Sequence, residues 1–587
     1  MIRRYTLSIQ GGDMVNNHQI SQIFEEMAEL LELSGENIFR VRAYQKASQI
    51  IGGLTKNARD LSQKELLEIP GIGKGIAAGI EEMGRSGKLQ DLEKLRSRFP
   101  KGLLEILRVP GLGPKRAMIL FSKLKIDSVD KLREAIERGK LRELDGFGAK
   151  LEENIRKGLT FAQGAGKRML YWNARLLMQD MLKVLKGFPE VVEAVPAGSY
   201  RRGRETVGDL DILCTARDGV KVLEHFAKLP QVERVLAQGE SKASVLLRAG
   251  LQCDLRVVPP HSFGAALQYF TGSKDHNVVL RELALKKGYS LNEYGLFKLS
   301  DKEHKRPVAG KTEEEIYKML GLATIPPELR ENRGEIQAAQ ENRLPRLIEM
   351  KDVRGDFHNH TFHTDGRHSM EEMAHAAEKM GWEWVAIGDH SQSLKVARGL
   401  SVESLRKSFR ELQEVQKKLP RLHLLRSMEV DILKDGSMDY PDAVLEEIDV
   451  VVASVHSAFN LPESEMTDRI KKAIRNPHVD IVGHLSGRLL GRRESYQVDT
   501  EEVLKEGALT QTAFEINGQP QRQDLWDVHA HRAKELDVPL ALTTDAHAVE
   551  QFEYMALAVI QARRAWIEKE DVLNSLSIKE LKEWLKN

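Results

Sequence analysis

The sequence predicts a multidomain protein with a helical amino-terminal region, an α+β middle region and a carboxy-terminal βα barrel. Three patterns indicate this division. Amphipathic helical patterns with glycine-bearing turns run from about residue 14 to 165, strand patterns begin at Val191, and short apolar runs alternate with helical patterns after residue 353. Repeated strand–helix units of the last kind are typical of parallel βα folds. The length of 587 residues also exceeds that of a single domain.

Composition and cysteine usage indicate a cytoplasmic protein. The hydrophobic share of 41% is ordinary for a globular chain, and the net charge of +1 by itself excludes no class of partner. Cys214 and Cys253 lie in apolar strand patterns, so we expect buried thiols of a reducing compartment. The opening MIRRYTLSIQGGD lacks the apolar core of a signal peptide, and no apolar run approaches the ~20 residues that span a bilayer.

Two glycine motifs near the amino terminus predict contacts to a DNA backbone. LEIPGIGKGIAAGI and LRVPGLGPKRAMIL each have the turn of a helix-hairpin-helix, in which glycines expose backbone N–H groups at a helix N-terminus, where a phosphate binds. The pattern also occurs in plain antiparallel helix packing. Between Pro70 and Lys123, however, 11 Lys or Arg face 5 Asp or Glu. The expected DNA-contacting residues here are Gly71, Gly73, Lys74, Gly111, Gly113, Lys115 and Arg116.

The middle region carries a candidate two-metal site. In AGSYRRGRETVGDLDIL, Asp209 and Asp211 stand two residues apart on a strand, so both carboxylates project to one face. Asp254 in LQCDLRVV is the natural third carboxylate if its strand pairs alongside. Two Mg²⁺ or Mn²⁺ ions held there would activate a 3′-hydroxyl and stabilise leaving pyrophosphate. The triphosphate would be bound by Gly198, Ser199 and Arg202.

A set of metal-type ligands marks the last 235 residues. Each stands where a short apolar run ends: His358, His360, Asp365, His390, Glu429, His456, His484, Asp545 and His547. A further run, TAFEING, carries Glu515 and Asn517 in the matching place. Because the carboxyl ends of barrel strands converge on one rim, these side chains should share a pocket. Six imidazoles and three carboxylates exceed the needs of one ion, so we infer two or three divalent metals.

These motifs carry a resemblance to two known families. With GSYRRGRETVGDLDIL and YFTGS, residues 14 to about 320 resemble the family X DNA polymerases, such as DNA polymerase beta, and the remainder looks like a PHP (polymerase and histidinol phosphatase) domain. The resemblance implies a nucleotidyltransferase palm with a small nucleotide-binding domain and a distorted (β/α)7 barrel. The implied divisions are an extension (1–13), a helix-hairpin-helix domain (14–92), a second one (93–165), the palm (166–260), a nucleotide-selection subdomain (261–320), a linker that can be part helical (321–352) and the barrel (353–587).

The polymerase resemblance also implies roles for single residues. It places the catalytic metals on the three aspartates and the incoming triphosphate at Ser199 and Arg202. In YFTGSKDHN, it places Tyr269 and Phe270 beside the nucleotide sugar, Gly272 in the nucleotide site and Asn277 at the base edge, with Arg281 on the template strand. Lys274 departs from an acidic residue of the vertebrate enzyme.

One departure bears on a further activity of polymerase beta. Aligning PGIGKGIAAGI on the family's hairpin puts Gly79 where a lysine forms a Schiff base with a 5′-deoxyribose phosphate. Glycine forms no imine, so we expect no lysine-dependent lyase unless Lys46 or Lys74 substitutes. The domain can still hold a 5′-phosphate at a gap through Arg40 and Lys46.

The PHP resemblance implies a trinuclear centre at the nine ligands and phosphodiester hydrolysis. We expect 3′→5′ exonuclease action, with 3′-end processing or abasic-site cleavage left open. Histidine-rich ligation favours Zn²⁺ or Mn²⁺ over Mg²⁺. Five arginines could steer nucleic acid to this rim: Arg398, Arg469, Arg488, Arg492 and Arg493.

The leading interpretation is a DNA repair polymerase that fills short gaps and trims 3′ ends. Its partners would be gapped or primed DNA and dNTPs, with no membrane, and by analogy a monomer. Two alternatives stay open: a DNA-binding protein fused to a small-molecule phosphatase of the histidinol phosphatase type, and a gapped-DNA sensor with a purely structural barrel.

Overall fold

The computed structural model describes residues 17–52, 54, 56–107, 112–144, 147–148, 151–152, 155, 168–301 and 306–586. The expected extension, residues 1–13, lies outside these ranges. The chain forms two compact units, residues 1–167 and 168–587. None of the described helices has the combined length and apolar character needed to cross a lipid bilayer.

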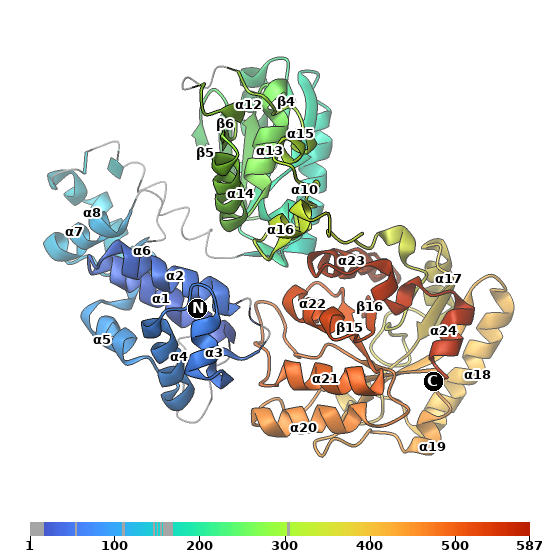
Figure 1. Ribbon diagram of the computed structural model, residues 1–587. Helices are drawn as coiled ribbons and strands as arrows, with labels where there is room; N and C mark the ends of the chain where they lie inside the picture. Colours follow the sequence, from blue (N-terminus) through green and yellow to red (C-terminus); the bar gives the residue numbers. More distant parts are fainter. Residues whose placement is uncertain are drawn as a thin grey trace. The chain divides into compact units, whose positions relative to one another are not determined.

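The first unit is helical and shares one hydrophobic core (blue in Figure 1). Phe24 of the first helix and Ile136 of the last belong to the same buried cluster. Because α5 spans the expected boundary between residues 92 and 93, that division stays a prediction. The helices are α1 (Asn17–Leu33), α2 (Ile38–Gly52), α3 (Gln63–Glu68), α4 (Lys74–Ser86), α5 (Gln90–Arg98), α6 (Lys101–Leu107), α7 (Pro114–Leu124) and α8 (Val129–Glu137).

The second unit begins with a five-stranded sheet in the order β2-β4-β7-β6-β5. Its central pair, β4 and β7, is parallel, whereas the other pairs are antiparallel. Apolar residues alternate along β4, and those that point inward pack under α10 and α12. The bounds are α10 (Tyr171–Lys186), β2 (Val191–Pro196), β4 (Asp209–Ala216), α12 (Gly219–Ala227), β5 (Val232–Gln238), β6 (Lys242–Leu247) and β7 (Gln252–Val257).

A smaller subdomain follows the sheet and includes the stretch that we expected to be a linker. Residues 321–352 contain α16, and Leu322, Ile325 and Leu329 are buried in one cluster with Leu280 of α14. The stretch folds because its apolar side chains fill this small core. The elements are α13 (Phe263–Thr271), α14 (Lys274–Lys286), β8 (Tyr289–Asn292), β9 (Gly295–Lys298), α15 (Glu313–Met319) and α16 (Glu335–Gln340).

Residues from 355 onward form a seven-stranded parallel barrel, which confirms the predicted fold class. The strands pair in sequence order, and a bridge between Asn359 and Ala546 nearly closes the ring. The strands are β10 (Gly355–Asp356), β11 (Trp384–Ile387), β12 (His423–Asp431), β13 (Val450–Ser454), β14 (Ile481–Val482), β15 (Ala513–Asn517) and β16 (Leu540–Thr543).

Helices cover the outside of this barrel (yellow to red in Figure 1). Side chains of one strand face pack against these helices, and those of the other face, such as Phe357 and Trp384, fill the interior. The helices are α17 (Met370–Lys379), α18 (Val402–Lys418), α19 (Asp442–Leu445), α20 (Glu463–Ile474), α21 (Thr500–Thr510), α22 (Asp527–Glu535), α23 (Met555–Arg564) and α24 (Ile578–Trp584).

Candidate active sites

The nine predicted barrel ligands all lie at the carboxyl ends of the strands. His358, His360 and Asp365 follow β10, His390 follows β11, Glu429 lies in β12, His456 follows β13, His484 follows β14, and Asp545 and His547 follow β16. Since parallel strands end on one rim, the fold gathers residues that are up to 189 positions apart in the sequence.

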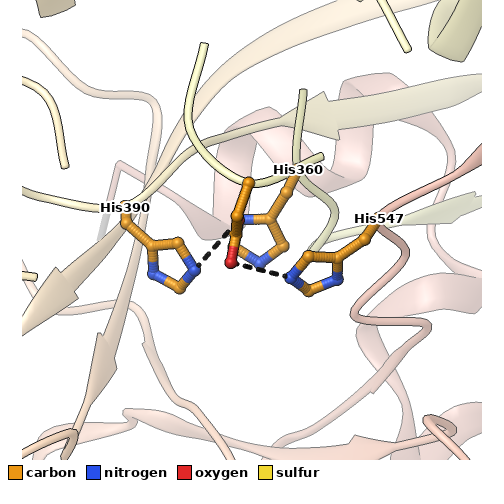
Figure 2. Close-up of side chains that lie close together, drawn as sticks. His360, His390 and His547 are labelled. Atoms are coloured by element: carbon orange, nitrogen blue, oxygen red, sulfur yellow. Dashed lines mark ion pairs between the residues drawn. The ribbon is translucent and has the colours of Figure 1, made fainter. Parts of the chain in front are cut away.

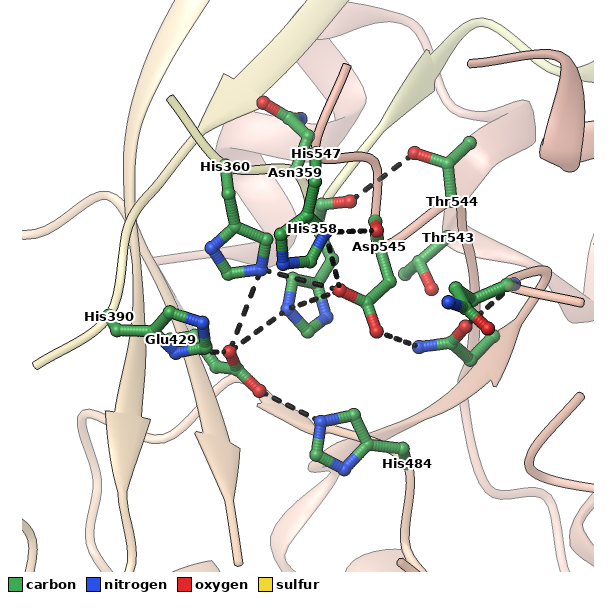
Figure 3. Close-up of polar contacts among 12 residues, drawn as sticks. His358, Asn359, His360, His390, Glu429, His484, Thr543, Thr544, Asp545 and His547 are labelled. Carbon is green, nitrogen blue, oxygen red and sulfur yellow. Dashed lines mark hydrogen bonds and ion pairs between the residues drawn. The ribbon is translucent and has the colours of Figure 1, made fainter. Parts of the chain in front are cut away.

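Glu429 is the centre of this cluster (Figure 3). One of its carboxylate oxygens lies 2.9 Å from Nε2 of His484 and 3.3 Å from Nε2 of His456. The other lies 2.8 Å from Nδ1 of His390 and 3.4 Å from Nε2 of His358. Both oxygens of this carboxylate therefore lie among imidazole nitrogens, as a carboxylate shared between two cations would require.

A second carboxylate, Asp365, lies among three imidazoles. Its two oxygens are each 3.4 Å from an imidazole nitrogen, one on His390 and the other on His547. Figure 2 shows these two rings and that of His360 turned toward one carboxylate. Asp545 completes the set, because its Oδ1 lies 3.4 Å from Nε2 of His360.

The donor atoms fit divalent cations. They form three groups whose ligand atoms lie within 4.8 Å of one another: His360, Asp365, His390 and His547; His358, His360 and Asp545; and His390, Glu429 and His456. Nε2 of His358 and of His360 is buried without a hydrogen-bond partner in the described part of the chain. Both lie 3.4 Å from a carboxylate oxygen. Two ligand atoms at tetrahedral positions around one ion, each about 2.1 Å from it, lie about 3.4 Å from each other.

Two further carboxylates orient the imidazoles from behind. Asp431 lies 2.6 Å from Nδ1 of His456, and Glu515 lies 2.7 Å from Nδ1 of His358. Partners of this kind fix the ring orientation of metal-ligating histidines. The TAFEING run therefore supplies Glu515 to the layer behind the ligands. Asp431 was not predicted, although its place two residues after Glu429 on one strand was a usable signal.

The protonation states differ among the imidazoles of the barrel. Burial, with His390 and His547 nearby, lowers the pKa of His360 to about 3, so its imidazole is neutral and can ligate. Burial opposes ionisation of Glu429, yet neighbouring His456 and His358 hold its pKa well below the usual value. Burial opposes protonation of His390, yet Glu429 and Asp365 raise its pKa to about 10, so this ring must lose its proton when a cation binds. Against the effect of burial, neighbouring carboxylates likewise raise the pKa values of His358, His456 and His547.

The three aspartates of the middle region meet on adjacent strands. Asp211 of β4 pairs in register with Asp254 of β7, and Asp209 stands two residues before Asp211. Asp254 accepts a hydrogen bond of 2.6 Å from Gln252 and forms an ion pair with Lys242.

Burial and mutual charge repulsion raise the pKa values of Asp209 and Asp211. Burial, followed by the charges of Asp209 and Asp254, raises the pKa of Asp211 to about 7. Burial and Asp254 likewise raise the pKa of Asp209. Repulsion between these carboxylates disfavours their ionised forms, and bound divalent cations would offset that repulsion.

The predicted triphosphate turn lies directly against the aspartates. Gly198 begins α11 (Gly198–Arg201) with a φ of +65°, and a Cβ there would lie 2.2 Å from Oδ2 of Asp211, so only glycine fits. Ser199 is the next residue of this turn. Arg202 donates 2.8 Å to the carbonyl of Thr271 and lies 3.1 Å from Glu331, so its guanidinium already has partners on the chain.

Residues of the YFTGS motif also contact one another. The rings of Tyr269 and Phe270 meet edge to face at 5.1 Å. The side-chain amide of Asn277 donates 2.7 Å to the carbonyl of Tyr269, and a Cβ on Gly272 would lie 2.5 Å from Oδ1 of Asn277. Arg281 donates 3.1 Å to the carbonyl of Asn277. The motif therefore forms one packed unit at the end of α13.

Comparison with known proteins assigns each region to a described domain. Residues 15–89 match the helix-hairpin-helix domain, and residues 103–160 match the SAM-like helix-hairpin-helix tandem. Residues 173–266 match the DNA polymerase beta palm, residues 266–331 its thumb, and residues 356–519 the PHP domain.

A relative that spans the whole chain decides the family. The DNA polymerase/3′-5′ exonuclease PolX of Bacillus subtilis strain 168 is 38% identical over 575 residues, which cover 97% of this chain and 100% of that protein. The chain belongs to the family X DNA polymerases with a PHP domain. A probable phosphatase of Thermoanaerobacter sp. strain X514 is 31% identical over 245 residues (39% of this chain, 94% of that protein). Rat DNA polymerase lambda is 28% identical over 332 residues (52% and 55%).

The helix-hairpin-helix turns of this family X polymerase have the expected local geometry. Gly73 precedes α4 and Gly113 precedes α7, and neither helix start has a side-chain cap. Gly71 has a φ of +100°. Lys74, Lys115 and Arg116 are exposed at these starts, whereas Gly111 lies outside the described residues.

Gly79, which we align with the lyase lysine of polymerase beta, is buried in α4. A Cβ there would lie 3.3 Å from Leu89 and 3.7 Å from Phe24. The position faces the domain core, and Lys46, the possible substitute, is exposed beside Gly71.

The arginines of the PHP barrel differ from one another in position. Arg469 of α20 is buried and donates 2.9 Å to the carbonyl of Leu433 in the loop after β12, and Arg488 binds Glu205 of the palm half. Of the five predicted arginines, Arg493 lines a cavity over the metal ligands. Arg522 lines it as well and was missed, because the polar stretch GQPQRQ gives no apolar run to mark it.

Proposed function

We propose that this polymerase fills short gaps in DNA by template-directed dNTP addition at the palm and removes nucleotides from 3′ ends at the PHP barrel. The observation that carries the proposal is the register of β4 and β7. It sets Asp211 opposite Asp254, and Asp211 lies against the Gly198 turn. The Bacillus subtilis relative, a DNA polymerase/3′-5′ exonuclease, supports both activities.

The palm residues bind and orient the reactants. Asp209, Asp211 and Asp254 hold two Mg²⁺ or Mn²⁺ ions, and the backbone N–H groups at Gly198 and Ser199 receive the triphosphate. When bound, the ions lower the pKa of the attacking 3′-hydroxyl and offset charge on the leaving pyrophosphate. Arg202 is already paired with Glu331, so it reaches the triphosphate by exchanging that partner.

The YFTGS unit orients the incoming nucleotide. Tyr269 and Phe270 support its sugar, and Gly272 leaves room for Asn277 beside them. Arg281 contacts the template strand. The Asn277 amide is engaged with the carbonyl of Tyr269, so it reaches a base edge by giving up that bond.

At the barrel, the nine ligands hold about three ions of Zn²⁺ or Mn²⁺, since imidazole donors suit these metals better than Mg²⁺. Asp431 and Glu515 keep His456 and His358 in ligating orientation. The helix-hairpin-helix turns hold the DNA backbone through Gly71, Gly73, Gly111 and Gly113 with Lys74, Lys115 and Arg116.

Further parts of the proposal concern the state of the protein. It is a cytoplasmic monomer in which Cys214 and Cys253 stay as free buried thiols, as their positions support. It lacks a lysine-dependent lyase, since Gly79 replaces the nucleophile.

Paired variants test the two activities on one gapped, labelled primer. Asp209→Ala together with Asp211→Ala should reduce dNTP incorporation at least 1,000-fold while nucleotide release continues, on the order of what loss of metal-held charge stabilisation costs. His360→Ala or Glu429→Ala should give the opposite result. Synthesis at wild-type rate by the double aspartate variant contradicts the palm assignment, and digestion at wild-type rate by Glu429→Ala contradicts the barrel assignment.

A small-molecule phosphatase is the second candidate for the barrel. The probable phosphatase of Thermoanaerobacter, 31% identical over 245 residues, favours it. Release of phosphate from histidinol phosphate with a higher kcat/KM than release of nucleotides from a primer would select this candidate.

A further inference from the structure

Five of the nine barrel ligands line a cavity of about 320 Å³ together with residues from several loops; the five are Asp365, His390, His456, Asp545 and His547. Arg493 follows β14 and Arg522 follows β15, and both line the cavity with His390, His547 and Asp545. Leu394, Val396 and Leu489 give the remaining wall an apolar surface. A cavity lined by metal-type ligands, two guanidinium groups and apolar side chains matches a ligand that has both anionic and apolar parts.

Arg522 places a fixed positive charge next to the ligand groups. Its Nε donates 2.9 Å to Oδ2 of Asp545, and the side chain is only 17% exposed. Neither terminal nitrogen has a hydrogen-bond acceptor among the described residues. These two N–H-bearing groups are therefore available to an anion that also reaches the cations on Asp545.

Arg493 is held in a second fixed position on the same cavity. Its Nε donates 2.9 Å to the carbonyl of Gly487, and its guanidinium lies 4.3 Å from the centre of the Phe459 ring. Its terminal nitrogens also have no acceptor within the described ranges. Two partly buried guanidinium groups on one cavity repel each other, so an anion between them would be favoured.

We propose that Arg522 and Arg493 bind the phosphates at the 3′ end of a single DNA strand, and that the cavity admits one unpaired terminal nucleotide. Arg522 contacts the phosphate that is cleaved, because it is bonded to a metal ligand, and Arg493 contacts the adjoining phosphate. A cavity of about 320 Å³ is at the small end of ligand sites, roughly 300–1,000 Å³, and holds a nucleotide but no base pair. This inference rests on the proposed exonuclease and adds its phosphate-binding residues and strand preference.

The test compares wild type with Arg493→Ala, Arg522→Ala and Arg522→Lys, and with Arg421→Ala as the matched control. Arg421 is exposed just before β12, at the opposite end of that strand from Glu429. The substrates are a 5′-labelled ten-nucleotide oligo(dT), free or fully paired, digested in Mn²⁺ at several salt concentrations. Bound metal per chain and gap-filling rate are measured for each variant to show that it is folded and loaded.

We expect Arg493→Ala to raise KM about tenfold with kcat within twofold, and Arg522→Ala to lower kcat/KM about 100-fold. Arg522→Lys should recover only part, since it keeps the charge but loses the two-pronged geometry. Each Ala variant should reduce the salt slope of log(kcat/KM) by about one unit, a change that a merely structural role would not produce. Free oligo(dT) should be digested at least tenfold faster than its paired form.

Distinct outcomes overturn distinct statements. If wild type releases no nucleotides, the proposed exonuclease is wrong, and this inference with it. If wild type digests DNA but Arg493→Ala equals Arg421→Ala in KM and salt slope, or paired ends are digested as fast as free ones, only the inference is wrong. If Arg522→Ala binds fewer metal ions than wild type, the result for Arg493→Ala decides whether the inference holds. The guanidinium of Arg493 bonds to the carbonyl of Gly487 and, among the residues that the structure describes, to no metal-ligating one.

Discussion

At the scale of single residues, the most informative group is Asp211. Its ionised carboxylate, which metal binding needs, lowers the stability of the folded protein. Burial and the charges of Asp209 and Asp254 raise its folded-state pKa to about 7 from an ordinary 3.8. A carboxyl whose pKa is raised on folding is destabilising when ionised. That cost is absent below about pH 4, grows between pH 4 and 7, and is complete above pH 7.

The first prediction follows from the destabilising effect of ionised Asp211 above pH 7. At pH 8 without divalent ions, Asp211→Asn should stabilise the protein by on the order of 1–3 kcal/mol, since one pKa unit corresponds to about 1.4 kcal/mol. At pH 4 the gain should vanish. Thermal unfolding with and without Mg²⁺ measures this, and Mg²⁺ should stabilise wild type more than the variant. An Asn variant that is less stable than wild type at pH 8 would contradict the account.

Single residues also show what the sequence could and could not predict. The barrel ligands were predictable because each ends an apolar run, and topology alone then brings them together. Asp254 was predictable because it lies on a strand able to pair with that of Asp211. The pairing of Arg202 with Glu331 was not, because it joins residues 129 positions apart through a stretch that reads as a polar linker. Arg522 was missed for a similar reason, since its loop has no periodic pattern.

At the scale of elements, the first helix-hairpin-helix turn depends on backbone conformation. Gly71 has a φ of +100°, and a Cβ there would lie 2.8 Å from Cδ1 of Ile50. Gly75, on the next helix, has open space around the same position. The two glycines therefore differ in what an added methyl group would cost.

The second prediction uses this pair. Gly71→Ala should destabilise the amino-terminal unit by roughly 1–2 kcal/mol, the cost of a left-handed backbone for an L-residue, and weaken binding to gapped DNA several-fold by distorting the turn. Gly75→Ala should gain up to about 1 kcal/mol from helix propensity. Urea unfolding and fluorescence anisotropy with labelled gapped DNA measure both effects. Equal behaviour of the two variants would show that the turn does not require its glycine.

At the scale of the whole molecule, helix α23 of the barrel is also part of the palm. Leu557 belongs to the palm's buried cluster, and a Cβ on Gly203 would lie 2.3 Å from Ile560. Arg564 of the same helix is 3% exposed and bonds the carbonyl of Arg202 at 2.7 Å, with Asp527 at 2.5 Å as a further partner. Burial opposes its charge, but Asp527 and Glu331 raise the pKa of Arg564.

The third prediction concerns this buried ion pair. Arg564→Met should destabilise the 168–587 unit by about 3–5 kcal/mol, because Asp527 and Glu331 lose a buried counter-charge. Arg406→Ala removes an exposed pair with Glu447 and should cost no more than about 1 kcal/mol. Calorimetric melting of both variants gives the comparison. Equal losses would mean that the α23 contact adds no more than a surface ion pair.

The double membership of α23 links the stability of the palm to cation binding at the barrel. Divalent cations that bind the folded barrel and not the unfolded chain would shift the population toward states in which α23 is formed. Since the same helix packs against Gly203, just after the Gly198 turn, a barrel that lacks its cations would also leave this turn of the palm less firmly supported.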